Sequence, residues 1–159
     1  MTDITPNIGS ILLTTDLSPD AASAYGMARS LMRAYNCHLT LLCCIDTSPQ
    51  FSEASFGSLE SLGLISAETM KDNLANVERA LKDCIATHFD PARSAYRVVD
   101  APIPVKHSIV TFVQQMEPDM VIISSHGRSG VSRALMGSVA EHVLRHCGRP
   151  VLVVPAQPR

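Results

Sequence analysis

Short apolar runs alternate with helix-like segments along most of the chain, and this alternation constrains the fold more than any other feature. Each run is rich in valine, isoleucine and leucine and is bounded by turn-forming residues, which is typical of a buried strand. Apolar strands that alternate with helices predict a parallel sheet covered by helices on both faces, an α/β fold. The predicted strands are residues 10–16, 38–46, 94–100, 119–124 and 150–155.

Apolar residues at three- and four-residue spacing predict the helices between these strands. Ser18 followed by Pro19 predicts an N-cap with proline at the first helical position. Residues 47–64 are rich in serine and glycine and have no clean period, so we expect an irregular excursion there. The predicted helices are residues 19–35, Ile65 to about His88, a helix opened by Pro102 and Pro104 that runs to Met116, and about Gly137 to His146.

Length and charge exclude several classes of protein. At 159 residues the chain can bury a sizeable core, and we expect one domain spanning residues 1–159. The net charge of −2 means that the chain lacks the surplus of positive charge typical of proteins that bind nucleic acid or an anionic membrane. The sequence also has no apolar span long enough to cross a bilayer and no signal-peptide pattern at its start. We therefore expect a cytoplasmic protein that binds neither nucleic acid nor membrane.

The five cysteines do not form a C-x-x-C pair or a disulfide framework, and their number is odd. We interpret them as small buried hydrophobic residues. Cys43 and Cys44 are adjacent in a predicted strand, so their side chains should point to opposite faces of the sheet.

The stretch SHGRSGVSRALMGS, residues 125–138, follows the fourth predicted strand and combines glycines, serines and arginines. Ligands of parallel sheets bind beyond the carboxyl ends of the strands. Glycines allow close approach to the backbone, and the helix that begins near Gly137 offers unpaired N–H groups to an anion. Composition alone favours the simpler interpretation, an ordinary glycine-rich loop before a helix.

Familiar catalytic and nucleotide motifs are absent from the sequence. There is no G-x-x-x-x-G-K-[ST], no G-x-G-x-x-G and no G-x-S-x-G. The segment TTDLSPDA after the first predicted strand contains no glycine, so a Rossmann-type pyrophosphate contact is not expected there.

The loop and its flanks resemble the universal stress protein family, which carries G-x-x-G, nine residues, and then G-[ST]. This chain reads Ser124-Ser-His-Gly127, nine residues, and Gly137-Ser138, followed by VAEHVLRHCGRPVLVVP, which is similar to the family's closing helix and strand. Thr15-Asp16-Leu17-Ser18 and the segment CCID are also similar to the family. The departure is Ser124, where the family has its first glycine.

The resemblance implies a five-stranded parallel sheet of order 3-2-1-4-5, a Rossmann-like fold of the adenine-nucleotide α-hydrolase type, with ATP at its carboxyl edge. It implies that Asp16 lies near the adenosine, that the backbone of Cys44 lies beside adenine, and that the segment from Gly137 holds phosphates. Mg²⁺ would be carried by the phosphates themselves. The expected nucleotide-binding residues are Thr15, Asp16, Cys44, Ile123, Ser124, Gly127, Arg128, Gly130, Gly137, Ser138 and Val139.

Several of these residues have a second interpretation. Asp16 either contacts the nucleotide or caps the following helix, or does both. Arg128 and Arg133 either contact phosphate or are solvated, and the loop favours phosphate contact for Arg128. His126 is interpreted as a loop residue rather than a catalytic base. His142 and His146 lie one helical turn apart, and we interpret them as surface residues rather than a metal site.

We expect an ATP-binding sensor or regulator of the stress response that acts as a homodimer through strand 150–155 and contacts an unidentified protein partner. No catalytic or metal-binding residue is assigned, and any ATP hydrolysis should be very slow. Two alternatives stay open: a nucleotide-free interaction module of the same family, in which Ser124 marks loss of the site, and an adenine-nucleotide α-hydrolase enzyme.

Overall fold

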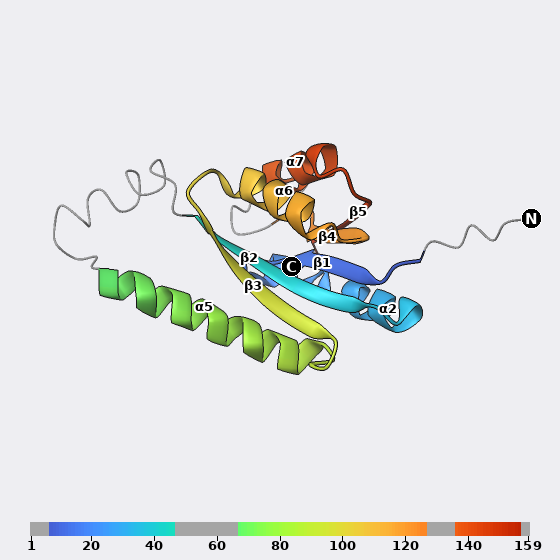
Figure 1. Ribbon diagram of the computed structural model, residues 1–159, viewed down its shortest axis with the longest axis horizontal. Helices are drawn as coiled ribbons and strands as arrows, with labels where there is room; N and C mark the ends of the chain where they lie inside the picture. The colour runs from blue at the N-terminus through green and yellow to red at the C-terminus, as the bar shows by residue number, and fades with distance from the viewer. Residues whose placement is uncertain (1–6, 47–66, 127–135, 157–159) are drawn as a thin grey trace, which may run out of the picture.

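Five parallel strands form one sheet in the order β3-β2-β1-β4-β5, in a computed structural model that describes residues 7–46, 67–126 and 136–156 (Figure 1). All four neighbouring pairs are parallel, and β1 lies between β2 and β4. The predicted α/β fold and its strand order are confirmed. The strands are β1 (Ser10–Thr14), β2 (His38–Asp46), β3 (Ser94–Ala101), β4 (Met120–Ser124) and β5 (Val151–Val154).

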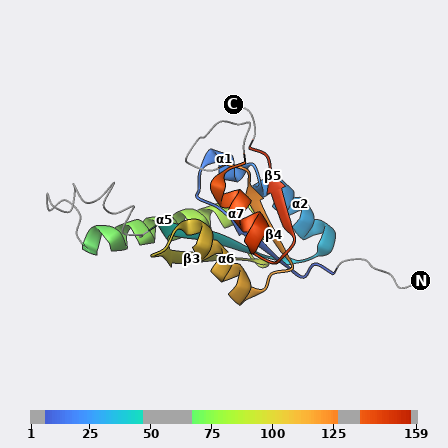
Figure 2. The same cartoon turned by 90° about the horizontal axis from the view of Figure 1, so that it is seen from above.

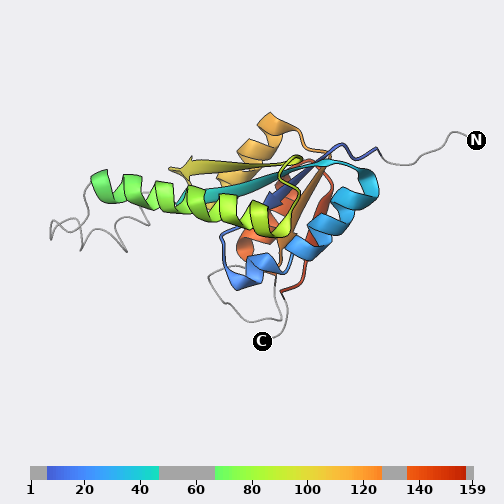
Figure 3. The same ribbon diagram turned by 90° about the horizontal axis from the view of Figure 1, so that it is seen from below.

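Helices cover both faces of the sheet. Helices α2 and α5 lie on one face, as Figure 3 shows, and α6 and α7 lie side by side on the other, as Figure 2 shows. No helix in the described part of the chain is long and apolar enough to span a membrane. The helices are α1 (Pro19–Ala22), α2 (Tyr25–Tyr35), α5 (Ala67–His88), α6 (Val105–Met116) and α7 (Ser138–His146).

The prediction of one continuous helix over residues 19–35 is wrong, because the chain forms α1 and α2 with a break at residues 23 and 24. The Ser23 hydroxyl donates to the carbonyl of Asp20 at 2.7 Å, and the Ser23 N–H donates to the same carbonyl at 3.3 Å. A serine hydroxyl that competes for a helix carbonyl favours such a break. The predicted cap is confirmed, since the Ser18 hydroxyl accepts from the N–H of Ala21 at 3.1 Å.

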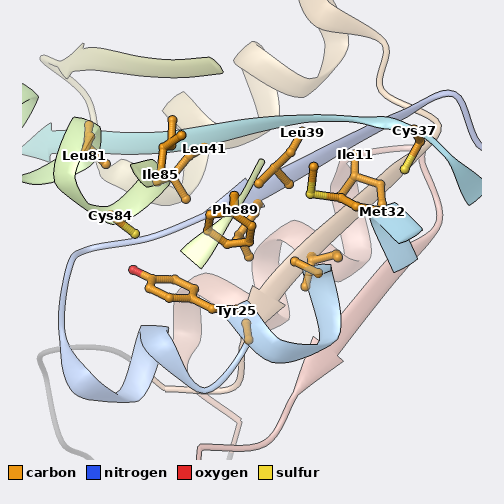
Figure 4. Close-up of a cluster of buried hydrophobic side chains, with 14 of the residues drawn as sticks. Ile11, Tyr25, Met32, Cys37, Leu39, Leu41, Leu81, Cys84, Ile85 and Phe89 are labelled. Atoms are coloured by element: carbon orange, nitrogen blue, oxygen red, sulfur yellow. The ribbon is translucent and has the colours of Figure 1, made fainter. Parts of the chain in front are cut away.

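Alternate residues of β1 supply the two halves of the core. Ile11 and Leu13 pack with residues of α2 and α5, whereas Leu12 packs with residues of α6 and α7, and all three are fully buried. The period of two along a strand puts successive side chains on opposite faces. This double burial explains why β1 is apolar at every central position. Figure 4 shows the α2 and α5 side of the core.

Four of the five cysteines are buried as predicted, and Cys44 is half-buried. Cys43 belongs to the cluster under α2 and α5, and Cys44 packs against the cluster under α6 and α7. All five thiols are free. The adjacent pair therefore points to opposite faces of the sheet.

Candidate functional site

The described candidate residues gather at the carboxyl edge of the three central strands. Thr15 and Asp16 follow β1, Cys44 lies near the end of β2, and Ile123 and Ser124 end β4. The strands β2, β1 and β4 are direct neighbours in the sheet. The other described candidates, at the beginning of α7, are hydrogen-bonded to the end of β4 through residues 125 and 137. Gly127, Arg128 and Gly130 lie outside the described residues.

The turn after β1 is held by its own side chains. The Thr15 hydroxyl accepts from the N–H of Leu17 at 3.0 Å, and the Asp16 carboxylate accepts from the N–H of Ser18 at 3.0 Å. Leu17 has a left-handed backbone with φ of 62°, a conformation that costs a residue with a side chain about 1–2 kcal/mol. Asp16 thus shapes the turn ahead of α1, while Ser18 caps the helix. The structure gives the capping role to Ser18 and not to Asp16.

Tyr25 supports this turn from α2, and the sequence reasoning missed it. Its hydroxyl lies 2.8 Å from the buried Thr15 hydroxyl. Its ring packs against His88 and Phe89 with centroid distances of 5.3 and 5.6 Å. Burial raises the pKa of Tyr25, so the phenol stays protonated. A buried tyrosine usually has a hydrogen-bond partner for its hydroxyl. The position of Tyr25 on the apolar face of a helix was therefore the sequence feature that could have indicated its role.

The end of β4 is closed by a short turn. Ser124 is buried, and its hydroxyl donates to the carbonyl of His126 at 2.5 Å. The side chain that replaces the family's first glycine is therefore used inside the protein. Ile123 is also buried, and it pairs with Val153 of β5.

Ser125 connects three segments at this edge, and the sequence reasoning missed this residue too. Its N–H donates to the carbonyl of Val154 at 2.8 Å, and its carbonyl accepts from the N–H of Gly137 at 2.8 Å. Its hydroxyl accepts from the N–H of Ala156 at 3.1 Å. The carboxyl end of β4 is thereby fixed to β5 and to the beginning of α7.

Close approach, and not the backbone dihedral angles, favours glycine at position 137. A Cβ at this position would lie 3.0 Å from the carbonyl oxygen of Ser125, tighter than nine in ten real contacts, so a side chain there requires its neighbour to shift. The φ of −61° and ψ of 145° are accessible to any residue. Because the Gly137 N–H already donates to Ser125, the amides left for a ligand are the following ones.

The N-terminus of α7 carries these amides. The first helical hydrogen bond runs from the N–H of Glu141 to the carbonyl of Gly137 at 3.0 Å, and no side chain of the described residues caps the helix. In α-helix geometry the N–H groups of Ser138, Val139 and Ala140 then have no acceptor within the helix. Together with the positive end of the helix dipole, they favour an anion at this position.

One further polar atom at this edge belongs to His126. The Ser125 hydroxyl lies 2.9 Å from Nδ1 of His126. Nε2 is buried and has no hydrogen-bond partner among the described residues. A buried polar atom without a partner is costly, and His126 directly precedes residues 127–135 in the chain.

The thiol of Cys44 is not activated. Burial raises its pKa to about 12, so the thiol is protonated near neutral pH and is a poor nucleophile. Cys44 pairs with Val99 in the β2 and β3 ladder, two residues before the end of β2.

The histidines of α7 have a third neighbour from α6. The rings of His142 and His146 stack at 4.2 Å, and His107 meets His142 edge-on at 4.4 Å. Nδ1 of His146 is 2.8 Å from the carbonyl of His142, which engages one ring nitrogen. In residues 7–46, 67–126 and 136–156, no group of three or more potential ligands is arranged to hold a metal ion.

Comparisons with known proteins find relatives among the universal stress proteins. A universal stress protein of Methanocaldococcus jannaschii is 25% identical over 145 residues, which cover 91% of this chain and 80% of that protein. A universal stress protein of Mycobacterium tuberculosis is 26% identical over 141 residues, or 87% of this chain. The match spans only 44% of the length of that mycobacterial relative.

Solved structures share the fold. A second Methanocaldococcus jannaschii protein of this group has a TM-score of 0.70 at 24% identity, with 96% of this chain and 99% of that chain covered. A universal stress protein in complex with cAMP has a TM-score of 0.61 at 19% identity, covering 95% and 99%. One from Archaeoglobus fulgidus in complex with dAMP has a TM-score of 0.59 at 14% identity, covering 94% and 99%.

A family model described as the universal stress protein family matches residues 7–155, nearly the whole chain. This match includes every strand of the sheet and all of the carboxyl edge described above except Ala156. The chain belongs to the universal stress protein family.

Proposed function

We propose that this protein binds ATP at the carboxyl edge of its sheet and acts as a nucleotide-dependent regulator in a stress response. The observation that carries the proposal is the N-terminus of α7, which no described side chain caps and which the Gly137–Ser125 hydrogen bond of 2.8 Å holds against the end of β4. Nε2 of His126, which is buried and has no hydrogen-bond partner among the described residues, adds a polar atom at the same edge. Solved family members in complex with cAMP and dAMP support an adenine nucleotide as the class of ligand.

In this proposal the adenosine lies over β1 and β2, beside Asp16 and the backbone of Cys44. Thr15 shapes the turn that presents Asp16, and Ile123 forms part of the floor. The phosphates lie over β4 and α7, where Ser138 and Val139 supply backbone amides. The remaining proposed phosphate contacts are Gly127, Arg128 and Gly130. Mg²⁺ would be bound through the phosphate oxygens, which suit its preference for oxygen ligands.

We assign no catalytic role to the described residues of this edge. The hydroxyls of Thr15 and Ser124 are hydrogen-bonded within turns, and the thiol of Cys44 is protonated at neutral pH. Phosphate release at about 1 per second or faster would contradict a binding role, and sustained production of AMP and pyrophosphate would support the α-hydrolase alternative.

The proposed assembly is a homodimer through β5. This strand lies at the edge of the sheet, and its four residues are all apolar and half-buried. An open apolar edge is an aggregation liability that pairing with a second copy removes. We propose that two copies pair their β5 strands antiparallel about a two-fold axis.

Calorimetric titration of nucleotide-free protein with ATP tests the binding proposal. We expect saturable binding that Gly137→Val abolishes, because a larger side chain meets the Ser125 carbonyl and displaces α7 from β4. Gly26→Val is the matched control, since a Cβ at Gly26 meets nothing within 4 Å. Its far-UV spectrum and its ATP affinity should stay close to those of the unchanged protein.

No binding by the unchanged protein at ATP concentrations up to about 1 mM would contradict the proposal. The nucleotide-free module would then be the better description. The buried side chain of Ser124, in place of the family's first glycine, is the observation that favours this second candidate.

A further inference from the structure

A cavity of about 370 Å³ opens at the opposite edge of the sheet from the proposed nucleotide site. It lies between the end of α2, the end of α5 and the turn that leads into β3, and these segments lie on one face in Figure 3. Because α2 precedes β2 and α5 precedes β3, this is the amino edge of those two strands. We call it the amino-edge cavity.

Cationic side chains dominate the rim of the amino-edge cavity. Arg29, Arg33 and Arg93 all line it, and Asp90 is the one carboxylate among its lining residues. Asp90 lies 3.9 Å from Arg93, a long ion pair. The salt bridges found among the described residues include neither Arg29 nor Arg33. The rim therefore has a surplus of positive charge.

Arg29 and Arg33 are also placed unfavourably with respect to each other. They lie four residues apart on α2, so their side chains are neighbours on one face of the helix. Like charges at this spacing destabilise a helix. An anion between the two guanidinium groups would offset the repulsion between them. The N–H groups of a guanidinium match the oxygens of carboxylates and phosphates, with which they form paired hydrogen bonds.

The third arginine is already held in place. The guanidinium group of Arg93 donates to the side-chain carbonyl of Asn36, the residue that ends α2 with a left-handed φ of 54°. The backbone carbonyl of Arg93 accepts from the N–H of Leu39 at 2.9 Å, which fixes the turn to the beginning of β2. A cationic group ordered before binding loses less conformational freedom when a ligand arrives.

The floor of the cavity is apolar. Met32 and Phe89 line the cavity and are 6% and 7% exposed, and Figure 4 shows both side chains in the core between the helices and the sheet. Aromatic and thioether side chains make favourable contacts with a flat apolar group. A cationic rim above an apolar floor selects a ligand with an anionic group and an apolar body.

We propose that the amino-edge cavity binds a small organic anion. A carboxylate or phosphate group lies between Arg29 and Arg33, with Arg93 beside it, and the apolar body rests on Met32 and Phe89. Ligand pockets usually enclose about 300–1,000 Å³, so the cavity accepts a molecule of one or two rings. This site is independent of the proposed nucleotide site, because it lies at the other end of the strands.

The test is an NMR titration of the full chain with phenyl phosphate and benzoate as probes. We expect saturable shifts of the backbone amides around Arg33 and Phe89 with at least one of the two probes. Inorganic phosphate, which lacks the ring, and benzyl alcohol, which lacks the charge, should each bind at least about tenfold more weakly. Preference for phenyl phosphate or benzoate identifies the anionic group.

The double variant Arg29→Gln, Arg33→Gln should weaken binding by about tenfold or more, as expected for losing charged hydrogen bonds. Arg79→Gln is the matched control, because Arg79 is exposed on α5, contacts Asn76 at 3.2 Å and does not line the cavity. Shifts that do not saturate at about 10 mM probe, or equal weakening by Arg79→Gln, would overturn the proposal. Equal affinity for inorganic phosphate and phenyl phosphate would overturn the role of the apolar floor.

Discussion

Tyr25→Phe removes a single oxygen atom and tests whether α2 supports the turn that presents Asp16. In the structure the Tyr25 hydroxyl lies 2.8 Å from the Thr15 hydroxyl, and both residues are buried. The Thr15 hydroxyl also accepts from the N–H of Leu17, which has the unfavourable left-handed backbone. Loss of the phenol oxygen leaves the Thr15 hydroxyl with that one partner among the described residues.

The magnitude follows from the kind of bond that is lost. A hydrogen bond between neutral groups contributes about 1 kcal/mol, and a buried hydroxyl left partly unsatisfied raises the cost to about 2 kcal/mol. In a protein of this size, each 1 kcal/mol lowers the unfolding temperature by about 2–4 °C. We therefore expect Tyr25→Phe to lower the unfolding temperature by about 2–8 °C while the ring packing against His88 and Phe89 is retained.

Differential scanning calorimetry and urea unfolding measure this change, with Tyr35→Phe as the control. Tyr35 lies at the other end of α2, is 39% exposed and has no hydrogen bond among the described residues, so its hydroxyl should contribute nothing measurable. If both variants have the same unfolding temperature as the unchanged protein, Tyr25 does not support the turn. The ATP affinity of Tyr25→Phe, measured under native conditions, should also fall.

Three further outcomes are expected. Ser124→Gly should weaken ATP binding about fivefold, because the turn loses the hydroxyl bond to His126; tighter binding by calorimetry would instead mean that Ser124 crowds the nucleotide. Hydrogen bonds from the Gly9 N–H, together with the hydroxyl and N–H of the next residue, hold the pKa of Asp119 below its ordinary value. The stability that these bonds contribute is fully present above the pKa of Asp119 in the unfolded chain and is lost as the pH falls through its pKa in the folded protein. In a plot of the urea midpoint against pH, Asp119→Asn should therefore reduce the fall on the acid side. An unchanged plot would contradict this role of Asp119. Val153→Lys should convert the proposed homodimer to a 17.2 kDa monomer in light scattering, and an unchanged mass would count against pairing through β5.

All five predicted runs became strands, with ends that differ by at most two residues. The central strands β1 and β4 are readable from sequence because they are buried on both faces, and a doubly buried strand must be apolar almost throughout. The break between α1 and α2 was not predicted. It depends on the Ser23 hydroxyl reaching the Asp20 carbonyl, a local competition that apolar spacing does not report.

The positions of the candidate residues in the fold were predictable, but the hydrogen bonds around them were not. The resemblance put Asp16 and Gly137 at one edge of the sheet, and the structure has them there, since strand order alone brings the ends of β1 and β4 together. The residues that hold this edge in shape, Tyr25 and Ser125, act on partners 10 and 31 residues away. Such pairings depend on the register of the sheet and the tilt of α2, which a single sequence does not reveal.

The two edges of the sheet differ in the source of their attraction for anions. At the carboxyl edge, the N-terminus of α7 supplies positive charge through backbone amides. At the amino edge, α2 and α5 present their C-terminal ends, whose dipoles repel anions, so only side chains can make that edge attractive. Arg33, in the last turn of α2, is explained by the helix dipole alone. Arg29 lies one turn earlier, beside a like charge, and the helix dipole does not explain its position. For this reason Arg29 is the residue that most clearly indicates a ligand.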